Sequence, residues 1–186
     1  MNELITFIIP SINRPTLLRC LMSLERQTNP NWRCIVIYDG VKGPVFRHEK
    51  ITFITIDKLG LIGPANGQAG LVRNVGIRAC STGWIGFLDD DDTIHPQYVE
   101  TLFSKYASFD FVVWRMKYQN GAILPPLHSN ELRFANVGIS FCYKRSLGSF
   151  LFDNNRDGED FDFLQKLFNT SRHYAVTSEV YYNVRH

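Results

Sequence analysis

The sequence predicts an α/β domain with a mostly parallel central sheet flanked by helices. Short apolar runs with the length of buried strands alternate with segments in which leucines recur at helical spacing. One of these runs, residues 84–88, ends abruptly in four consecutive aspartates. The chain has 186 residues, of which 45% are apolar and 20% charged, so we expect residues 1–186 to form a single domain with a real core.

The first part of the chain predicts two strands joined by a helix, followed by a third strand. Pro10 should stop the first strand, and the helix follows Asn13 as a possible cap and Pro15 as a suitable first residue. Because the order strand, helix, strand needs a crossover, the first two strands should pair in parallel. The predicted spans are 4–9 (strand), 15–26 (helix), 34–38 (strand) and 51–56 (strand).

The rest of the chain continues the alternation after a glycine-rich stretch. Residues 60–70 lack the phosphate-loop motif, and we expect a mobile loop, in the manner of a lid. Residues 117–136 are polar and should be irregular. The remaining predicted spans are 71–80 (helix), 84–88 (strand), 96–106 (helix), 109–114 (strand), 137–143 (strand), 159–168 (helix), and the short strand-like segments 174–176 and 180–184.

The four aspartates at positions 89–92 are the most informative feature of the sequence. A strand buried on both faces cannot hold four charges, so the acids must emerge at its C-terminal edge, where open α/β sheets bind ligands. Carboxylates packed this closely repel one another, and a divalent cation relieves the repulsion. The alternative is a solvated charge run at the end of a strand.

Composition narrows the function classes. The net charge of +2, with no basic block, argues against nucleic acid as the partner. The four cysteines are far apart and form no CxxC pair, which favours buried free thiols and a reducing compartment, so we expect a cytoplasmic protein. The N-terminus has no signal-peptide pattern, and no apolar run is long enough for an integral membrane segment.

Five short motifs then occur in order along the chain. They are F-I-I-P-S-I-N-R at 7–14, Y-D-G at 38–40, R-N-V-G-I at 73–77, F-L-D-D-D-D at 87–92 and G-E-D at 158–160. Together they resemble the family 2 glycosyltransferases of the GT-A fold, over essentially the whole chain. The resemblance implies a Rossmann-like GT-A domain with a donor-binding part at about 1–115 and an acceptor part with the catalytic base at about 116–186.

The resemblance also implies the reaction and its cofactor. Members of the family transfer a sugar from a nucleotide diphosphate donor, here a UDP-sugar as the preferred expectation, to a hydroxyl of a glycan or other acceptor. The transfer usually inverts the sugar and usually needs Mn²⁺ or Mg²⁺. A cation held by carboxylates suits this chemistry, because it stabilises the charge that grows on the leaving diphosphate.

The motifs assign roles to individual residues. By resemblance Asp91 binds the metal, and His186 completes the metal site, with a disordered terminal histidine as the alternative. Asp39 resembles the acid that contacts the nucleoside, and a plain Asp-Gly turn is its alternative. Arg14 and Arg73 are candidates for diphosphate or base contacts, with surface solubility and a structural ion pair as their respective alternatives. The full set expected to bind the nucleotide sugar is Pro10, Ser11, Asn13, Arg14, Asp39, Arg73, Asp89 and Asp90.

Two acids at the start of a predicted helix are the catalytic candidates. An inverting transfer needs a carboxylate that takes the proton of the acceptor hydroxyl, and we expect Asp160 to be this base. Glu159 would hold Asp160 or bind acceptor hydroxyls. The alternative is that the helix dipole favours acids in its first turn, without any catalytic role.

Two other functions fit parts of the sequence. Residues 89–93 also match DxDxT after an apolar strand, the motif of haloacid-dehalogenase-type phosphatases, with Asp89 as nucleophile and magnesium as cofactor. That motif normally lies near the start of its fold, whereas here two strands and a helix precede it. A non-catalytic domain that binds sugar nucleotides or glycans is the other alternative, against which the intact Asp91 and Asp160 argue.

Overall fold

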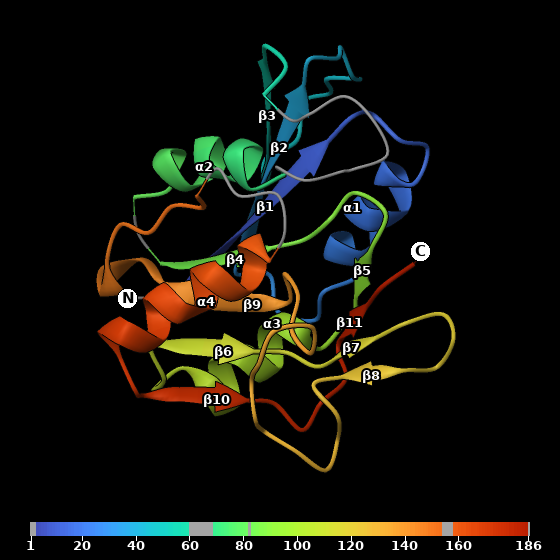
Figure 1. The fold of residues 1–186 in the computed structure, drawn as a ribbon. Helices are drawn as coiled ribbons and strands as arrows, with labels where there is room; N and C mark the ends of the chain where they lie inside the picture. The colour runs from blue at the N-terminus through green and yellow to red at the C-terminus, as the bar shows by residue number, and fades with distance from the viewer. Residues whose placement is uncertain (1–2, 60–68, 82, 154–157, 186) are drawn as a thin grey trace.

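The computed structural model describes residues 3–59, 69–81, 83–153 and 158–185 (Figure 1). Most of the predicted glycine-rich loop, residues 60–68, lies outside the described residues. The helices are α1 (Leu17–Glu25), α2 (Ala69–Ala79), α3 (Tyr98–Thr101), which continues as a π-helical turn over Leu102–Tyr106, a 3₁₀ turn at Arg145–Leu147, and α4 (Glu159–Thr170). The strands are β1 (Ile5–Ser11), β2 (Trp32–Asp39), β3 (Ile51–Ile56), β4 (Trp84–Phe87), β5 (Thr93–Ile94), β6 (Phe111–Val113), β7 (Met116–Lys117), β8 (Ile123–Leu124), β9 (Phe141–Lys144), β10 (Tyr174–Val176) and β11 (Tyr182–Asn183).

The larger sheet has seven strands in the order β10-β6-β9-β4-β1-β2-β3. Strand β9 runs antiparallel to both neighbours, β4 and β6, and the other four pairings are parallel. The predicted mostly parallel sheet is therefore confirmed. The helix between β1 and β2 makes the crossover that a parallel pair requires.

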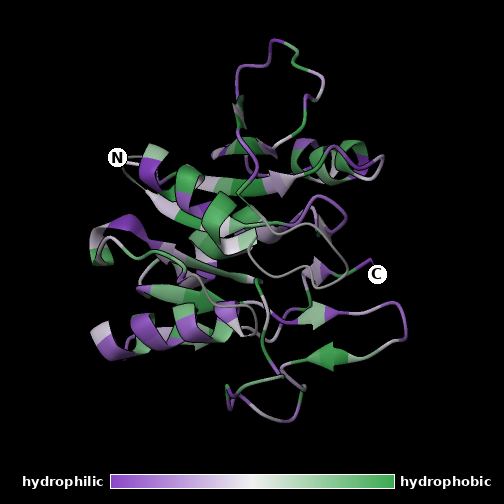
Figure 2. Ribbon diagram, turned by 45° about the horizontal axis from the view of Figure 1, so that its top comes forward, coloured by the Kyte–Doolittle hydropathy of each residue, from purple (hydrophilic) through white to green (hydrophobic). Residues whose placement is uncertain are grey.

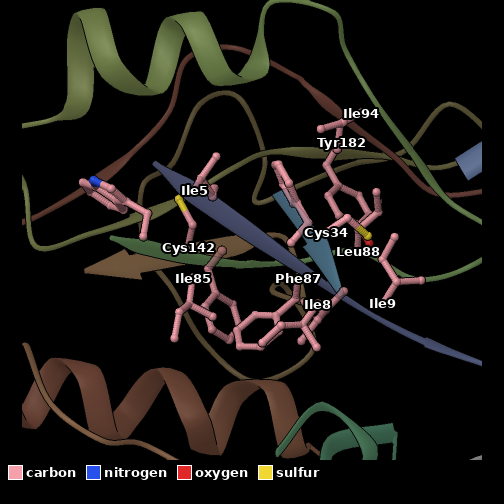
Figure 3. Close-up of a cluster of buried hydrophobic side chains, with 14 of the residues drawn as sticks. Ile5, Ile8, Ile9, Cys34, Ile85, Phe87, Leu88, Ile94, Cys142 and Tyr182 are labelled. Atoms are coloured by element: carbon pink, nitrogen blue, oxygen red, sulfur yellow. The ribbon is translucent and has the colours of Figure 1, made fainter. Parts of the chain in front are cut away.

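Helices cover both faces of this sheet because the strand side chains are apolar on both sides. Phe163 of α4 packs edge-on against Phe87 of β4, and on the opposite face Tyr98 of α3 packs against Phe7 of β1. Figure 3 shows the alternation: Ile8, Ile85 and Phe87 point to the side of α4, whereas Cys34 and Cys142 point to the opposite side. Two layers of helices thus enclose the sheet.

A second, smaller sheet has the order β5-β11-β7-β8. Its strands have two residues each, too few for a period-2 pattern to be visible in the sequence. The expectation that residues 117–136 are irregular is therefore wrong for β7 and β8, which pair in antiparallel fashion. Through the pairing of β11 with β5, the end of the chain returns to the segment that follows β4.

Two expectations at the start of the chain are wrong. Pro10 does not stop β1, which continues to Ser11. The Leu88 amide donates to the Ile8 carbonyl, so the backbone polar groups of Ile8 face β4. Those of Pro10, two residues further along β1, face the same side, but the pairing with β4 has ended before Pro10. The missing N–H of the proline therefore removes no hydrogen bond from the sheet. Asn13 is not the helix cap, because α1 begins after Thr16 and Asn13 has a φ of 61°.

The core between the sheet and the helices is mainly apolar, and it contains no disulfide. The four cysteines are buried and free, as the sequence predicts. Figure 2 shows mostly hydrophobic residues along the strands of the larger sheet, whereas hydrophilic and hydrophobic residues alternate along α4. Within the described residues, no helix has both the length and the apolar character needed to cross a membrane.

Candidate active site

The acid cluster lies at the C-terminal edge of the larger sheet, as predicted. Strands β1 and β2 end there at Ser11 and Asp39, and the four aspartates follow β4 in a turn in which the Asp92 amide donates to the Asp89 carbonyl at 3.1 Å. Asp90 and Asp92 are buried, each 2% exposed. The side chains of Asp89 and Asp91 are 28% and 19% exposed. The carboxylates of the cluster therefore alternate along the chain between partly exposed and buried positions.

The first motif is fastened to the acid cluster. The Ser11 hydroxyl donates to Asp90 at 2.7 Å, and the Arg14 guanidinium donates to Asp90 at 2.8 Å and to Asp91 at 3.0 Å. Burial raises the pKa of Asp90, while the hydrogen bond from Ser11 and the charge of Arg14 oppose that rise. Arg14 remains 41% exposed, which leaves it a cation on the open side of the cluster.

Arg73 connects the two halves of the predicted site. It is 3% exposed in α2, and its guanidinium binds Asp89 through Nη2 and Glu159 through Nη1 at 2.9 Å, with Asp160 at 3.9 Å. The three surrounding carboxylates raise the pKa of Arg73 against the effect of its burial. The sequence left a diphosphate contact and a structural ion pair open for Arg73, and the contacts found are those of an ion-pair network.

Glu159 is held in place from two sides. Its carboxylate accepts the amide of Gly70 at 3.1 Å as well as the Arg73 guanidinium. A side chain at Gly70 would collide with this carboxylate, since a Cβ there would lie 2.6 Å from Oε2. Glu159 thus ties the start of α4 to the start of α2.

Asp160 has a carboxylate that resists ionisation. Burial raises its pKa to about 7; the charge of Arg73 opposes this rise, and Asp89 and Glu159 add to it. Oδ1 is buried without a hydrogen-bond partner among the described residues, while the side chain as a whole is 27% exposed. A carboxyl group that gains and loses its proton near pH 7 is suited to general-base catalysis.

The end of the chain closes on the same cluster. Arg185 donates its backbone N–H to Asp92 at 2.9 Å, and the Asp89 amide donates to the hydroxyl of Tyr182 at 3.2 Å. Burial, followed by the charge of Asp89, raises the pKa of Asp92 to about 7. His186 lies outside the described residues, so its role at the metal stays a prediction.

The other predicted donor residues lie around the same edge. Asp39, 4% exposed, accepts the Lys58 ammonium at 2.7 Å and the Leu59 amide at 2.6 Å. The backbone N–H of Asn13 donates to the Ser11 hydroxyl at 2.9 Å. Pro10 contributes backbone to β1 immediately before Ser11. Their contacts with a nucleotide remain predictions.

The carboxylates present fit a hard divalent cation. Within the described residues no group of three or more Asp, Glu, His or Cys side chains forms a ready-made metal cage. Mg²⁺ is usually bound by one or two carboxylates and completed by phosphate oxygens and water, and the outward-facing Asp89 and Asp91 offer such oxygens. A cation here would also relieve the repulsion that raises the pKa of Asp92.

The fold and the site define the class of protein. It is a Rossmann-like α/β domain of the GT-A type, in which carboxylates and arginines gather at the carboxyl edge of a mostly parallel sheet. The chain belongs to glycosyl transferase family 2, whose family model matches residues 6–175. This membership leaves the phosphatase alternative without support.

Curated relatives agree with the family assignment. Glycosyltransferase GlyA of Streptococcus pneumoniae is 32% identical over 114 residues, which cover 59% of this chain and 16% of that protein. The uncharacterized glycosyltransferase EpsJ of Bacillus subtilis is 25% identical over 212 residues, covering 100% of this chain and 62% of that protein. The chain therefore spans less than two thirds of the length of these relatives.

Solved structures share the fold. The structure of S. aureus TarS 1–349 in complex with UDP-GlcNAc has a TM-score of 0.77 at 18% identity, covering 97% of this chain and 58% of that one. Mannosyltransferase PcManGT from Pyrobaculum calidifontis, in complex with GDP-Man and Mn²⁺, has a TM-score of 0.67 at 13% identity, covering 100% of this chain and 57% of that one.

Two residues, one in the site and one that holds a neighbouring segment, make contacts that the sequence did not indicate. The Tyr182 hydroxyl contacts the Asp89 amide across 93 residues of chain, a contact without any local signal. Arg115 is 3% exposed and holds the segment after β8 through several carbonyl groups, including Pro125 at 2.7 Å. Arginine is rarely buried, so the apolar residues around Arg115 in the sequence were not sufficient to predict its burial.

Proposed function

We propose that this chain transfers a sugar from a UDP-sugar to an acceptor hydroxyl, with inversion at the anomeric carbon. Family membership supports sugar transfer, and the complex of TarS with UDP-GlcNAc supports the choice of uridine nucleotide by analogy of fold. In this proposal about residues 1–115 bind the donor, and about residues 116–186 supply the base and the acceptor site.

The observation that carries the proposal is the network around Arg73. One guanidinium binds Asp89 of the acid cluster and Glu159 of α4, with Asp160 beside them. A donor bound at the acid cluster would therefore have its sugar close to a carboxyl group with a pKa of about 7. Carboxyl groups with a strongly raised pKa beside a charge network occur most often at functional sites, which favours a catalytic role for Asp160 over a purely structural one.

The chemistry is a single displacement. As the acceptor oxygen bonds to the anomeric carbon, Asp160 accepts the hydroxyl proton, and the bond from that carbon to the diphosphate oxygen breaks. The electron pair of the broken bond leaves with the diphosphate. Attack from the face opposite the leaving group inverts the anomeric configuration, and Glu159 keeps Asp160 in position through Arg73.

The remaining residues would bind the donor. Asp39 would hydrogen-bond the nucleoside, and Arg14, the exposed cation at the cluster, would contact diphosphate oxygens. Ser11 and Asn13, with Pro10 setting the backbone before them, would line the nucleotide. Mn²⁺ or Mg²⁺ would be held by Asp91 and His186, and would neutralise charge on the diphosphate.

A thermal-shift screen tests the proposal. UDP, GDP and dTDP and their common sugar conjugates are added with MnCl₂ or with chelator, because a ligand that binds the native state must raise the melting temperature. We expect UDP and at least one UDP-sugar to stabilise the protein when Mn²⁺ is present. Stabilisation by none of these nucleotides, or Asp89-dependent hydrolysis of an aryl phosphate, would overturn the proposal.

A further inference from the structure

An exposed aromatic ring lies at the start of α4, the helix that carries Asp160. Phe134 lies between β8 and β9, and it is 62% exposed. Its ring contacts the start of α4: a Cβ on Gly158 would lie 2.6 Å from the ring, and the Phe161 ring centroid is 6.2 Å away. Figure 1 shows the segment between β8 and β9 passing the start of α4. A large apolar ring is thus left in solvent beside Gly158 and Phe161, the residues that flank Glu159 and Asp160.

The turn that carries Phe134 is braced by one side chain. Asn136 accepts the Arg133 amide at 2.9 Å, and its own amide group donates to the Glu131 carbonyl at 2.9 Å. Ala135, next to the ring, adopts a φ of 68°. Because these bonds fix residues 131–136 in advance, little conformational entropy would be lost when a ligand packs on the ring.

The preceding residues are anchored by Arg115. Its guanidinium donates to the Pro125 carbonyl at 2.7 Å, to the Ser129 carbonyl at 3.1 Å and to the Asn130 side chain at 2.7 Å. On the other side its Nε donates to the Thr177 carbonyl at 2.7 Å. Residues 125–130, which lead into the braced turn, are therefore fastened to the body of the domain.

The same segment continues along one side of the proposed base. A Cβ on Gly138 would lie 3.9 Å from Oδ2 of Asp160, whereas Arg73 faces Oδ1. The oxygen that is directed away from the ion-pair network thus faces the segment that carries Phe134. An acceptor hydroxyl that reaches Oδ2 would bring the rest of the acceptor over this segment.

We propose that Phe134 is the platform on which a sugar ring of the acceptor packs, so that the acceptor is a glycoside. This inference rests on the proposed function. One face of a pyranose presents C–H groups, while its hydroxyls point outward from the rim. Such a face excludes water from an aromatic ring and places positive C–H edges on its negative π-face. Leu127, 61% exposed in the same segment, has no flat face to offer.

Saturation-transfer NMR tests the platform. The probes are the methyl pyranosides of glucose, galactose, mannose and N-acetylglucosamine, added with UDP and Mg²⁺. We expect at least one glycoside to bind the wild type, Phe134→Tyr and the matched control Leu127→Ala. Phe134→Ala should lose affinity on the order of tenfold, as for an aromatic anchor at a binding hot spot. Melting temperatures verify that each variant is folded.

Two outcomes would overturn the inference. One is equal glycoside affinity in the wild type and in Phe134→Ala, and the other is a wild type that binds UDP but none of the four glycosides. UDP titration and slow hydrolysis of the UDP-sugar by the wild type separate the two proposals. If both are absent, the proposed function fails, whereas if both are present without an effect of Phe134, the platform alone fails.

Discussion

Asp160 is the residue on which the proposed chemistry depends. Replacing it with asparagine keeps its shape but removes its capacity to accept a proton. We expect transfer to fall by about 10²–10⁴-fold in Asp160→Asn, the usual contribution of a general base, with UDP affinity nearly unchanged. Single-turnover assays with a UDP-sugar measure this. Asp162→Asn, which changes another carboxylate in the first turn of α4, is the control and should keep its transfer rate. Near-wild-type transfer in Asp160→Asn would show that another residue is the base.

The raised pKa of Asp160 also predicts a pH dependence of stability. Between about 4 and 7 the folded state keeps a proton that the unfolded state has released, so the free energy of unfolding contributed by this group falls as pH rises. The stability of the wild type relative to Asp160→Asn should therefore decline over this window and level off above it. Urea unfolding of both proteins at several pH values measures the difference, and a constant difference would contradict the raised pKa.

Arg73 compensates three carboxylates, so its loss should be costly. Arg73→Gln leaves Asp89, Glu159 and Asp160 without their shared buried cation. Breaking a buried pair in this way typically costs about 3–5 kcal/mol of stability. Arg26→Gln, at an exposed position, should change stability by less than about 0.5 kcal/mol. Chemical denaturation compares the two, and equal small effects would show that the network contributes nothing to stability.

At the level of elements, α2 fits tightly against the sheet. A Cβ on Gly76 would lie 2.6 Å from Cγ2 of Ile8 and 3.1 Å from Cδ1 of Ile37. Gly76→Ala would gain about 1 kcal/mol of helix propensity but lose about 1–3 kcal/mol by overpacking, so we expect no gain and a lower melting temperature. Arg78→Ala, on the exposed side of the same helix, is the control. A stabilised Gly76→Ala would show that α2 can shift away.

The sequence predicts helices and strands well where apolar residues recur at a regular spacing or where a glycine or proline ends the segment. The spans Ile51–Ile56 and Tyr174–Val176 match the prediction residue for residue. Strands of two residues, such as β7 and β8, carry no period and were missed. The prediction that Pro10 ends the first strand was wrong because the sequence does not show whether a neighbouring strand needs the missing N–H of the proline.

The sequence singled out residues that the structure brings together, but it did not indicate which of them contact one another. The motifs identified Arg73, Glu159 and Asp160, yet the ion pair between Arg73 and Glu159 joins residues 86 positions apart. Which of two plausible partners an arginine takes depends on tertiary packing, and the sequence left that choice open. The raised pKa of Asp160 likewise follows from burial, which no local pattern specifies.

At the scale of the whole molecule, the topology gathers distant segments at one edge. Strands β1, β2 and β4 end there, the small sheet returns Arg185 to Asp92, and α2 and α4 meet through Arg73. A protein built in this way can couple donor binding at the sheet edge with a base from a later helix. We propose that this edge binds a nucleoside diphosphate together with a divalent cation.

Calorimetric titration of UDP tests that claim most directly. We expect UDP to bind much more tightly with Mn²⁺ or Mg²⁺ than with chelator, and the difference to shrink in Asp91→Asn and in a chain ending at Arg185, where His186 is removed. Glu100→Gln, which changes a carboxylate on α3, serves as the control and should behave as wild type. Equal UDP affinity with cation and with chelator, or no UDP binding in either, would contradict the account.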